Sequence, residues 1–399
     1  MAEAISRVPA DFRGSQAASD VTERLLSFLD NVIIPMEQSA GLKWGDIPPK
    51  DLLQSVWTKS AEAGFYTLLL PAELGGAGLS MHDIVAVKEA SIAHGAILGL
   101  HVLGELTGPP RIGHLYQSAT PFQVEHFLDP VCRAEKAVCF ALTEPDSGSD
   151  AASISTHAVR DGDSFILNGY KRFISGSPYA DFAVVIAVTD PDKGAKGISA
   201  FFVDLHSPGC EVKQDYEVLS DQRSHADIDF KDVRVPAANL IGEEGQGFYL
   251  GMARITMNRL LHCATMLGYS RIALKESVNY ASRRRQFGRS IGEFQAIQHM
   301  LAKMNTELYA SRSMMFDAAA QSDTGQDIRM EASMCKVHAS ETCFNVVDSA
   351  MQIHGGQGML KGSVIEYLFR FLRMYRIVTG TSEIQRNTIA KAMLSPGKN

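Results

Sequence analysis

The pattern of hydrophobic and polar positions divides the chain into three blocks. From Ser19 to about Glu135, hydrophobic residues recur every three or four positions, which is typical of amphipathic helices. Turn-forming residues interrupt this pattern at Pro48-Pro49 and again between Pro71 and Gly78. The first block is therefore predicted to be entirely helical.

Between Lys136 and about Leu240 the hydrophobic period changes to two. Short runs rich in β-branched and aromatic residues are separated by Gly, Asp, Asn and Pro, which is typical of strands joined by turns. The runs cover residues 137–142, 165–168, 182–188, 198–203, 210–212 and 226–235. Asp161-Gly162 is a dipeptide that favours hairpins. The pattern predicts an antiparallel β-barrel or sandwich of about 100 residues.

Helical spacing returns after the glycine-rich stretch 241–247 and continues almost to the end of the chain. Three or four long, largely apolar helices predict a bundle with two buried faces. We therefore expect an α+β chain of three domains. They are an N-terminal helical domain (1–135), a central β domain (136–240) and a C-terminal helical bundle (241–399).

Composition and charge exclude several functional classes. With 45% hydrophobic and 21% charged residues over 399 positions, the whole chain is expected to fold. The net charge of −7 gives no positive field for nucleic acid, and no apolar run is long enough for a membrane helix. Six scattered cysteines without a C-x-x-C pair indicate a reducing compartment, and we expect a cytoplasmic protein. The histidines show no metal-ligand spacing, so no metal site is predicted.

Five short segments are candidates for chemistry. They are Leu142–Asp150, Asn168–Gly176, Arg283–Gly288, Gln352–Gly358 and Gly380–Arg386. Each has a simpler structural explanation when taken alone, such as a turn, a cationic helix C-terminus or a capping box. The motifs of Rossmann folds, P-loops, serine hydrolases and zinc peptidases are missing from the sequence.

Taken together and in this order, the five segments resemble the acyl-CoA dehydrogenase family of flavoproteins, over nearly the whole chain. That family has a helical domain, a β domain and a C-terminal four-helix domain, in the order that the hydrophobic periods predict. The resemblance implies FAD as cofactor and an acyl thioester as substrate, carried on CoA or on acyl carrier protein. It also implies electron-transfer flavoprotein, or oxygen, as the electron acceptor.

The resemblance assigns expected FAD contacts to individual residues. Phe140, Leu142 and Thr143 match positions at the pyrimidine edge of the flavin, and Ser149 one near the pyrophosphate and the thioester. The triplet beside the flavin's dimethylbenzene and N5 side is matched by Phe173, Ile174 and Ser175, where the family often has Trp in place of Phe173.

Other matching positions contact the FAD of a neighbouring subunit: Arg284, Phe287, Gln295, Gln352 and Gly356. Thr381 and Glu383 match FAD contacts in the last motif. Because such sites combine two chains, the resemblance implies a homotetramer, or at least a dimer.

The resemblance breaks at the catalytic base. Family members remove the α proton of the thioester with a carboxylate while hydride leaves Cβ for flavin N5. The two positions that the family uses for this carboxylate hold Thr379 and Asn258, the latter immediately before the matching structural arginine, Arg259. Neither a hydroxyl nor an amide accepts a proton at pH 7 without activation.

Three explanations stay open at this point. Another side chain could be the base, with Glu105, Asp146, His262 and Glu366 as candidates. The chemistry could instead need no such base, as in an elimination or an oxygen-dependent flavin reaction. Or the chain could be a non-catalytic subunit that completes a heteromeric FAD site. We favour an α,β-dehydrogenase because every motif on the flavin side remains.

Overall fold

The computed structural model describes residues 9–219 and 223–394, which form two compact units. The helical unit contains the described residues up to Asp46, Leu79–Gly99 and the residues from Thr256 onward. The sheet unit contains Ile47–Gly78 and Leu100–Ile255. The boundaries of the three domains expected from the sequence stay a prediction.

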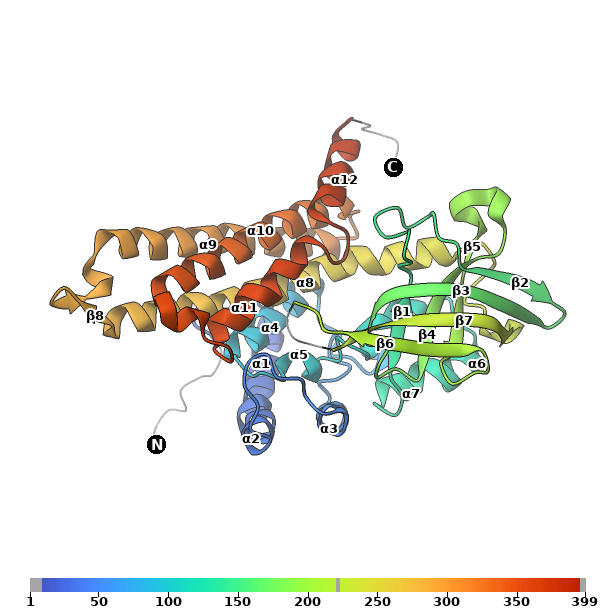
Figure 1. The fold of residues 1–399 in the computed structure, drawn as a ribbon, viewed down its shortest axis with the longest axis horizontal. Coiled ribbons are helices and arrows are strands. Elements are labelled where there is room, and N and C mark those ends of the chain that lie inside the picture. Colours follow the sequence, from blue (N-terminus) through green and yellow to red (C-terminus); the bar gives the residue numbers. More distant parts are fainter. Residues whose placement is uncertain (1–8, 220–222, 395–399) are drawn as a thin grey trace. The chain divides into compact units, whose positions relative to one another are not determined.

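A seven-stranded sheet organises the sheet unit, and the alternating pattern predicts six of its strands (Figure 1). Its strands are β1 (Val138–Ala141), β2 (His157–Asp161), β3 (Ser164–Ser175), β4 (Phe182–Val188), β5 (Ile198–Asp204), β6 (Cys210–Tyr216) and β7 (His225–Pro236). Their order is β1-β4-β2-β3-β7-β6, with β5 also paired to β4. Most pairs are antiparallel, but β4 runs parallel to β1 and meets β2 in a parallel bridge.

The β2–β3 hairpin turns where the Asp161-Gly162 dipeptide predicts it, since Asp161 pairs with Ser164 and Gly162 has a φ of +62°. The segment Asn168–Gly176, for which a turn is the simpler explanation from the sequence, instead lies almost entirely within β3. Two irregularities in the β3–β7 register, between Leu167 and Gly169 and between Lys171 and Ile174, bend the strand there.

Two hydrophobic clusters pack the sheet. One is formed by the strands and their adjoining turns, and in it the rings of Phe165 and Phe201 pack edge to face with their centres 4.9 Å apart. In the other, Phe182 and Phe202 of the sheet pack against helical residues that include Leu115. The helices of this unit are α3 (Lys50–Glu62), α5 (Gly99–Val102), α6 (Pro121–Gln123) and α7 (Asp129–Cys132).

Long helices build the helical unit and confirm the predicted bundle (Figure 1). They are α1 (Gln16–Phe28), α2 (Ile34–Ser39), α4 (Met81–His94), α8 (Gly247–Arg283, of which this unit contains the part from Thr256), α9 (Gln295–Asp323), α10 (Arg329–His354), α11 (Val364–Arg373) and α12 (Ser382–Leu394). Helix α10 packs against α9, α11 and α12. A hairpin absent from the sequence prediction, β8 (Arg285–Gln286) and β9 (Arg289–Ser290), joins α8 to α9. Within the described ranges, no helix is long and apolar enough to cross a membrane.

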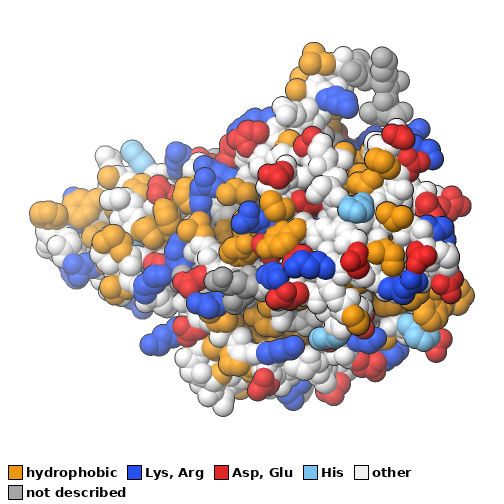
Figure 2. Space-filling view, turned by 45° about the vertical axis from the view of Figure 1, so that its right-hand side comes forward, with side chains coloured by type: hydrophobic (Ala, Val, Ile, Leu, Met, Phe, Trp, Pro, Cys, Tyr) orange, Lys and Arg blue, Asp and Glu red, His pale blue; other side chains and the backbone are white. Residues whose placement is uncertain are grey.

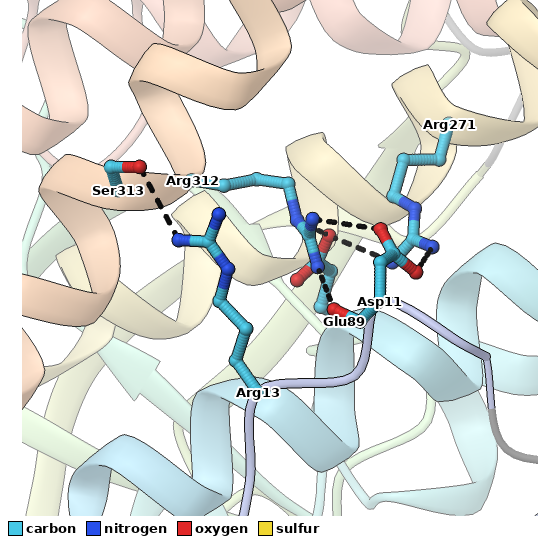
Figure 3. A network of polar contacts seen from close by, with 6 residues as sticks. All are labelled: Asp11, Arg13, Glu89, Arg271, Arg312 and Ser313. Carbon is cyan, nitrogen blue, oxygen red and sulfur yellow. Dashed lines mark hydrogen bonds and ion pairs between the residues drawn. The ribbon is translucent and has the colours of Figure 1, made fainter.

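An ionic network ties the segment before α1 to three helices of this unit (Figure 3). The carboxylate of Glu89, on α4, forms ion pairs with Arg271 of α8 (3.1 Å) and Arg312 of α9 (2.6 Å). Asp11 pairs with the same two guanidinium groups at 2.6 and 2.8 Å. The Glu89 side chain is 2% exposed and that of Asp11 53% exposed, so the two carboxylates contribute unequally.

We predict that Glu89→Gln lowers the free energy of unfolding by about 3–5 kcal/mol, because it leaves two largely buried guanidinium groups without their buried carboxylate. Asp11→Asn, the matched control, should cost about 1 kcal/mol or less, since exposed pairs are screened by water. Urea unfolding followed by circular dichroism measures both. Equal losses in the two variants would contradict the assignment of Glu89 as the central partner.

Candidate active site

The first two motifs meet in the sheet unit. Leu142 and Thr143 follow β1, and the backbone amide of Arg172 in β3 donates to the carbonyl oxygen of Thr143 at 2.7 Å. The ammonium of Lys171 donates to the carbonyl oxygen of Leu142 at 3.0 Å. The structure thus joins two motifs that are 29 residues apart in the chain.

A buried ion pair fixes this junction. Lys171 Nζ lies 2.7 Å from Glu144 Oε1, and the two side chains are 0% and 3% exposed. Glu144 also accepts hydrogen bonds from the backbone amides of Ser155 and Thr156 at 2.6 and 2.9 Å. Burial favours the neutral acid, but the charge of Lys171 and these hydrogen bonds outweigh it and lower the pKa of Glu144 to about 2. Burial lowers the pKa of Lys171 to about 8, although Glu144 opposes this.

A second buried carboxylate holds the triplet 173–175. Asp227 accepts from the backbone amide of Phe173 at 3.0 Å and from the hydroxyls of Tyr170 and Tyr216 at 2.7 and 2.6 Å. Phe173 has a φ of +55°, a conformation that is rare for a bulky residue. Its ring is 52% exposed, whereas Ile174 is buried. The triplet therefore presents an aromatic ring from a backbone that is held by hydrogen bonds.

The turn before α12 carries Thr379 and lies in the helical unit. Thr379 and Gly380 have φ values of +58° and +86°. The ammonium of buried Lys336, on α10, donates to Gly380 O at 2.6 Å. The amide of buried Gln385 donates to the carbonyl oxygens of Thr379 (3.2 Å) and Gly380 (3.0 Å). Burial lowers the pKa of Lys336 to about 8. Two buried polar side chains thus hold a left-handed turn.

A hydrogen bond joins Thr379 to one of the four candidate bases. Thr379 Oγ1 lies 2.9 Å from His262 Nδ1, and the His262 ring meets the ring of Tyr375 edge to face at 5.4 Å. His262 is on α8, four residues after Asn258, so the two residues share one face of that helix. Both are half-buried.

Arg259 lies buried beside these residues on α8. Its Nη1 donates to Ser333 Oγ at 3.1 Å, and burial lowers its pKa. Its Nε has no hydrogen-bond partner among the described residues. Arg259 and Lys336 are close enough for the charge of Arg259 to contribute to the lowered pKa of Lys336. The predicted structural arginine therefore packs near the turn that carries Thr379.

The other three candidate bases lie in different settings. Glu366 forms a two-point pair with Arg370 one turn along α11, at 2.6 and 2.9 Å. Asp146 is exposed in the turn after β1, and Glu105 is half-buried in the sheet unit. Within the described chain, His262 is the one candidate with a hydrogen bond to Thr379.

Thr381 and Glu383, the predicted FAD contacts in the segment Gly380–Arg386, have mainly local partners. Thr381 Oγ1 accepts from the backbone amide of Ile384 at 3.3 Å and so caps α12, as the capping pattern predicts. Glu383 lies 3.9 Å from Arg386 with its side chain 76% exposed. Their expected FAD contacts stay predictions.

The residues expected to contact a neighbouring subunit's FAD are exposed on the helical unit: Arg284, Phe287, Gln295, Gln352 and Gly356. Phe287, in the β8–β9 turn, is 92% exposed. Figure 2 shows hydrophobic side chains gathered on the surface at the left of the view, the end where the β8–β9 hairpin lies in Figure 1. Such exposure fits a surface that another chain covers.

These residues have the chemistry that FAD requires. The guanidinium of Arg284 has no hydrogen bond or ion pair with the described residues, so it is available to a phosphate. A Cβ added to Gly355 or Gly356 would meet nothing within 4 Å, so the backbone is open to close approach by a ligand. In the sheet unit, Ser149 is exposed in the turn after β1.

The sequence analysis missed three site residues, Asp227, Lys336 and Gln385, all of which are buried. Asp227 and Lys336 stand between hydrophobic residues, which is a signal of burial, whereas Gln385 stands in a mostly polar segment. Buried polar groups need partners. The sequence does not show which partners they have, because each bonds to backbone far away along the chain or across a turn.

Comparison with known proteins agrees with this arrangement. The N-terminal, middle and C-terminal domain models of acyl-CoA dehydrogenases match residues 15–135, 139–233 and 245–394. A 3-(aryl)acrylate reductase of Clostridium sporogenes is 38% identical, over 87% of this chain and 90% of that protein. The caffeyl-CoA reductase-Etf complex subunit CarC of Acetobacterium woodii is 39% identical, over 86% of this chain and 90% of its own.

A solved structure of PigA in complex with FAD matches this chain with a TM-score of 0.86 and 28% identity, over 96% of this chain and 99% of that one. The chain belongs to the acyl-CoA dehydrogenase family. Within it, the protein is an FAD-dependent oxidoreductase that acts on acyl thioesters. The family resemblance seen in the sequence is thereby confirmed.

We predict that Arg284→Ala weakens FAD binding by about 10- to 100-fold, because a charge-assisted hydrogen bond contributes roughly 1.5–3 kcal/mol. Arg283→Ala is the matched control, since that side chain already donates to the carbonyl oxygen of Asn279. Fluorescence titration of the apoprotein with FAD gives both affinities. Wild-type affinity in Arg284→Ala would remove this residue from the cofactor site.

Proposed function

We propose that this protein interconverts a saturated acyl thioester and its 2-enoyl thioester. The observation that carries the proposal is the junction of the two flavin-side motifs, in which Arg172 donates to Thr143 above the buried Lys171–Glu144 pair. The junction supports the proposal because it joins the backbones of the two segments that resemble flavin contacts and holds them with a buried ion pair.

Different residues would bind the cofactor and face the substrate. When bound, FAD supplies the acceptor for the hydride that leaves Cβ. Leu142, Thr143 and the Phe173–Ser175 triplet would hold the flavin ring. Ser149, together with Arg284 and Gln352 from a neighbouring subunit, would hold the more polar part of the cofactor. Asn258, Arg259 and Thr379 belong to the helical unit and would face the thioester. Proton transfer at Cα is the step that these side chains must support.

We further propose a CoA thioester as substrate and electron-transfer flavoprotein as redox partner. Two lines of support are the relative named as a subunit of a caffeyl-CoA reductase-Etf complex and the whole-length match of this chain to acyl-CoA dehydrogenases. An acyl carrier protein handle and direct use of oxygen are the competing possibilities. The cytoplasmic location stays a prediction from the sequence.

Anaerobic mixing of the FAD-loaded protein with a panel of acyl thioesters tests this function. We predict bleaching of the flavin absorbance near 450 nm by at least one saturated acyl-CoA, and reoxidation by electron-transfer flavoprotein. Bleaching by an acyl carrier protein thioester alone would show that the substrate is carried on acyl carrier protein rather than on CoA. A protein that takes up no FAD, or an FAD-loaded protein that no thioester reduces, would support the non-catalytic or altered-chemistry alternatives instead.

The exposure of the residues that are expected to contact FAD also indicates that several copies of the chain assemble. We propose a homotetramer that covers the surface around Arg284 and Phe287, since these side chains are exposed in one chain. Light scattering should give a mass of about four times 43.5 kDa for the FAD-loaded protein. A stable FAD-bound monomer would contradict the proposal, and an equimolar complex with a second, related chain would favour a hetero-oligomer.

A further inference from the structure

Both positions where the family has its catalytic carboxylate lack one here, yet removal of an α proton needs an acceptor. We infer that His262, acting through the hydroxyl of Thr379, is the proton acceptor and donor of this enzyme. The inference rests on the proposed function, because it assigns the proton that α,β-dehydrogenation moves. Its direct basis is the 2.9 Å contact between Thr379 Oγ1 and His262 Nδ1.

The backbone holds the hydroxyl in one place. A β-branched residue in the left-handed region is strained, and such a conformation persists only where surrounding contacts hold it. Lys336 and Gln385 provide those contacts through the carbonyl oxygens of residues 379 and 380. Strain maintained by two buried polar side chains is typical of functional sites.

The imidazole of His262 can accept the proton of the Thr379 hydroxyl. A threonine hydroxyl alone is too weak a base, but an imidazole nitrogen that accepts its proton activates it, as in other hydroxyl–histidine pairs. Imidazole is the side chain that gains and loses a proton most readily near neutral pH. The position of His262 is set by its place on α8 and by the edge of the Tyr375 ring.

The proton step balances without any further reactant. The C–H bond at the thioester Cα breaks, and its electron pair moves to the thioester carbonyl oxygen to form an enolate. The proton forms a new O–H bond on Thr379 while the original hydroxyl proton passes to His262 Nδ1. Reduction of a 2-enoyl thioester uses the same path in the opposite direction, so that the imidazolium returns its proton to Cα.

Exchange of the α protons with D₂O tests the inference, since it reports proton transfer separately from flavin reduction. Mass spectrometry of butyryl-CoA incubated with the FAD-loaded protein, without an electron acceptor, gives the rate. We expect His262→Gln and Thr379→Val to lose about 10²–10⁴-fold in exchange. Binding of butyryl-CoA, measured by calorimetry, should change by less than about fivefold, because His262→Gln removes no contact with the thioester and Thr379→Val replaces the hydroxyl with a methyl group of similar size.

Conservative and control variants separate chemistry from folding. Thr379→Ser keeps the hydroxyl and should recover most of the exchange that Thr379→Val loses. His206→Gln, which alters an exposed histidine in the sheet unit, should exchange at the wild-type rate. In the His262→Gln background, Thr379→Glu supplies a carboxylate directly and should restore exchange by at least about 10²-fold.

A readout that needs no turnover completes the test. In protein labelled with ¹⁵N-histidine, the Nδ1 resonance of His262 should shift on Thr379→Val and return towards its wild-type position on Thr379→Ser. This measurement also works on protein without FAD. If the Nδ1 resonance of His262 is the same in the wild type and in both variants, the hydrogen bond on which the inference depends does not exist.

Failure of the inference and failure of the proposed function give different results. If the wild type exchanges α protons and bleaches with butyryl-CoA while His262→Gln and Thr379→Val exchange as fast, the inference is wrong and the function stands. If no saturated acyl thioester binds to the wild type and bleaches its flavin, the proposed function itself is wrong. Should Thr379→Val not fold, His262→Gln with and without Thr379→Glu decides the question.

Discussion

The left-handed turn at Thr379-Gly380 is the constraint from which the chemistry of the helical unit follows. A non-glycine residue in this conformation costs about 1–2 kcal/mol, so the turn needs external support. Lys336 and Gln385 give it from inside the bundle, by donating to two successive carbonyl oxygens. Because both donors are buried, water does not compete for these hydrogen bonds, and the Thr379 hydroxyl is kept beside His262.

In the sheet unit, buried carboxylates likewise hold irregular backbone segments in place. Glu144, paired with Lys171, fixes the loop after β1, and Asp227 fixes the backbone of Phe173. In each case a buried charge satisfies backbone groups that leave regular secondary structure, which is how a turn or bulge inside a protein avoids unsatisfied polar atoms. The segments that would meet cofactor and substrate are thus irregular but firmly held.

Much of this architecture could be predicted from the sequence, and the missing parts have identifiable causes. Period changes located the helices and six of the seven strands, and Asp161-Gly162 marked the β2–β3 hairpin. Strand β2 was missed because Val159 and its charged neighbours are exposed and carry little hydrophobic signal. The choice of His262 among four candidate bases could not be made from the sequence, since it depends on a contact across 117 residues and on a positive φ that favours glycine rather than threonine.

We infer that this protein binds FAD as its family does and that a threonine–histidine pair takes the place of the usual carboxylate. The most direct test is a crystal structure of the protein with FAD and a non-oxidisable acyl-CoA thioester. We predict the thioester Cα within about 3.5 Å of Thr379 Oγ1, with His262 still hydrogen-bonded to that oxygen. A Cα that lies instead against a carboxylate, with Thr379 turned away from it, would contradict a role of the threonine–histidine pair in proton transfer.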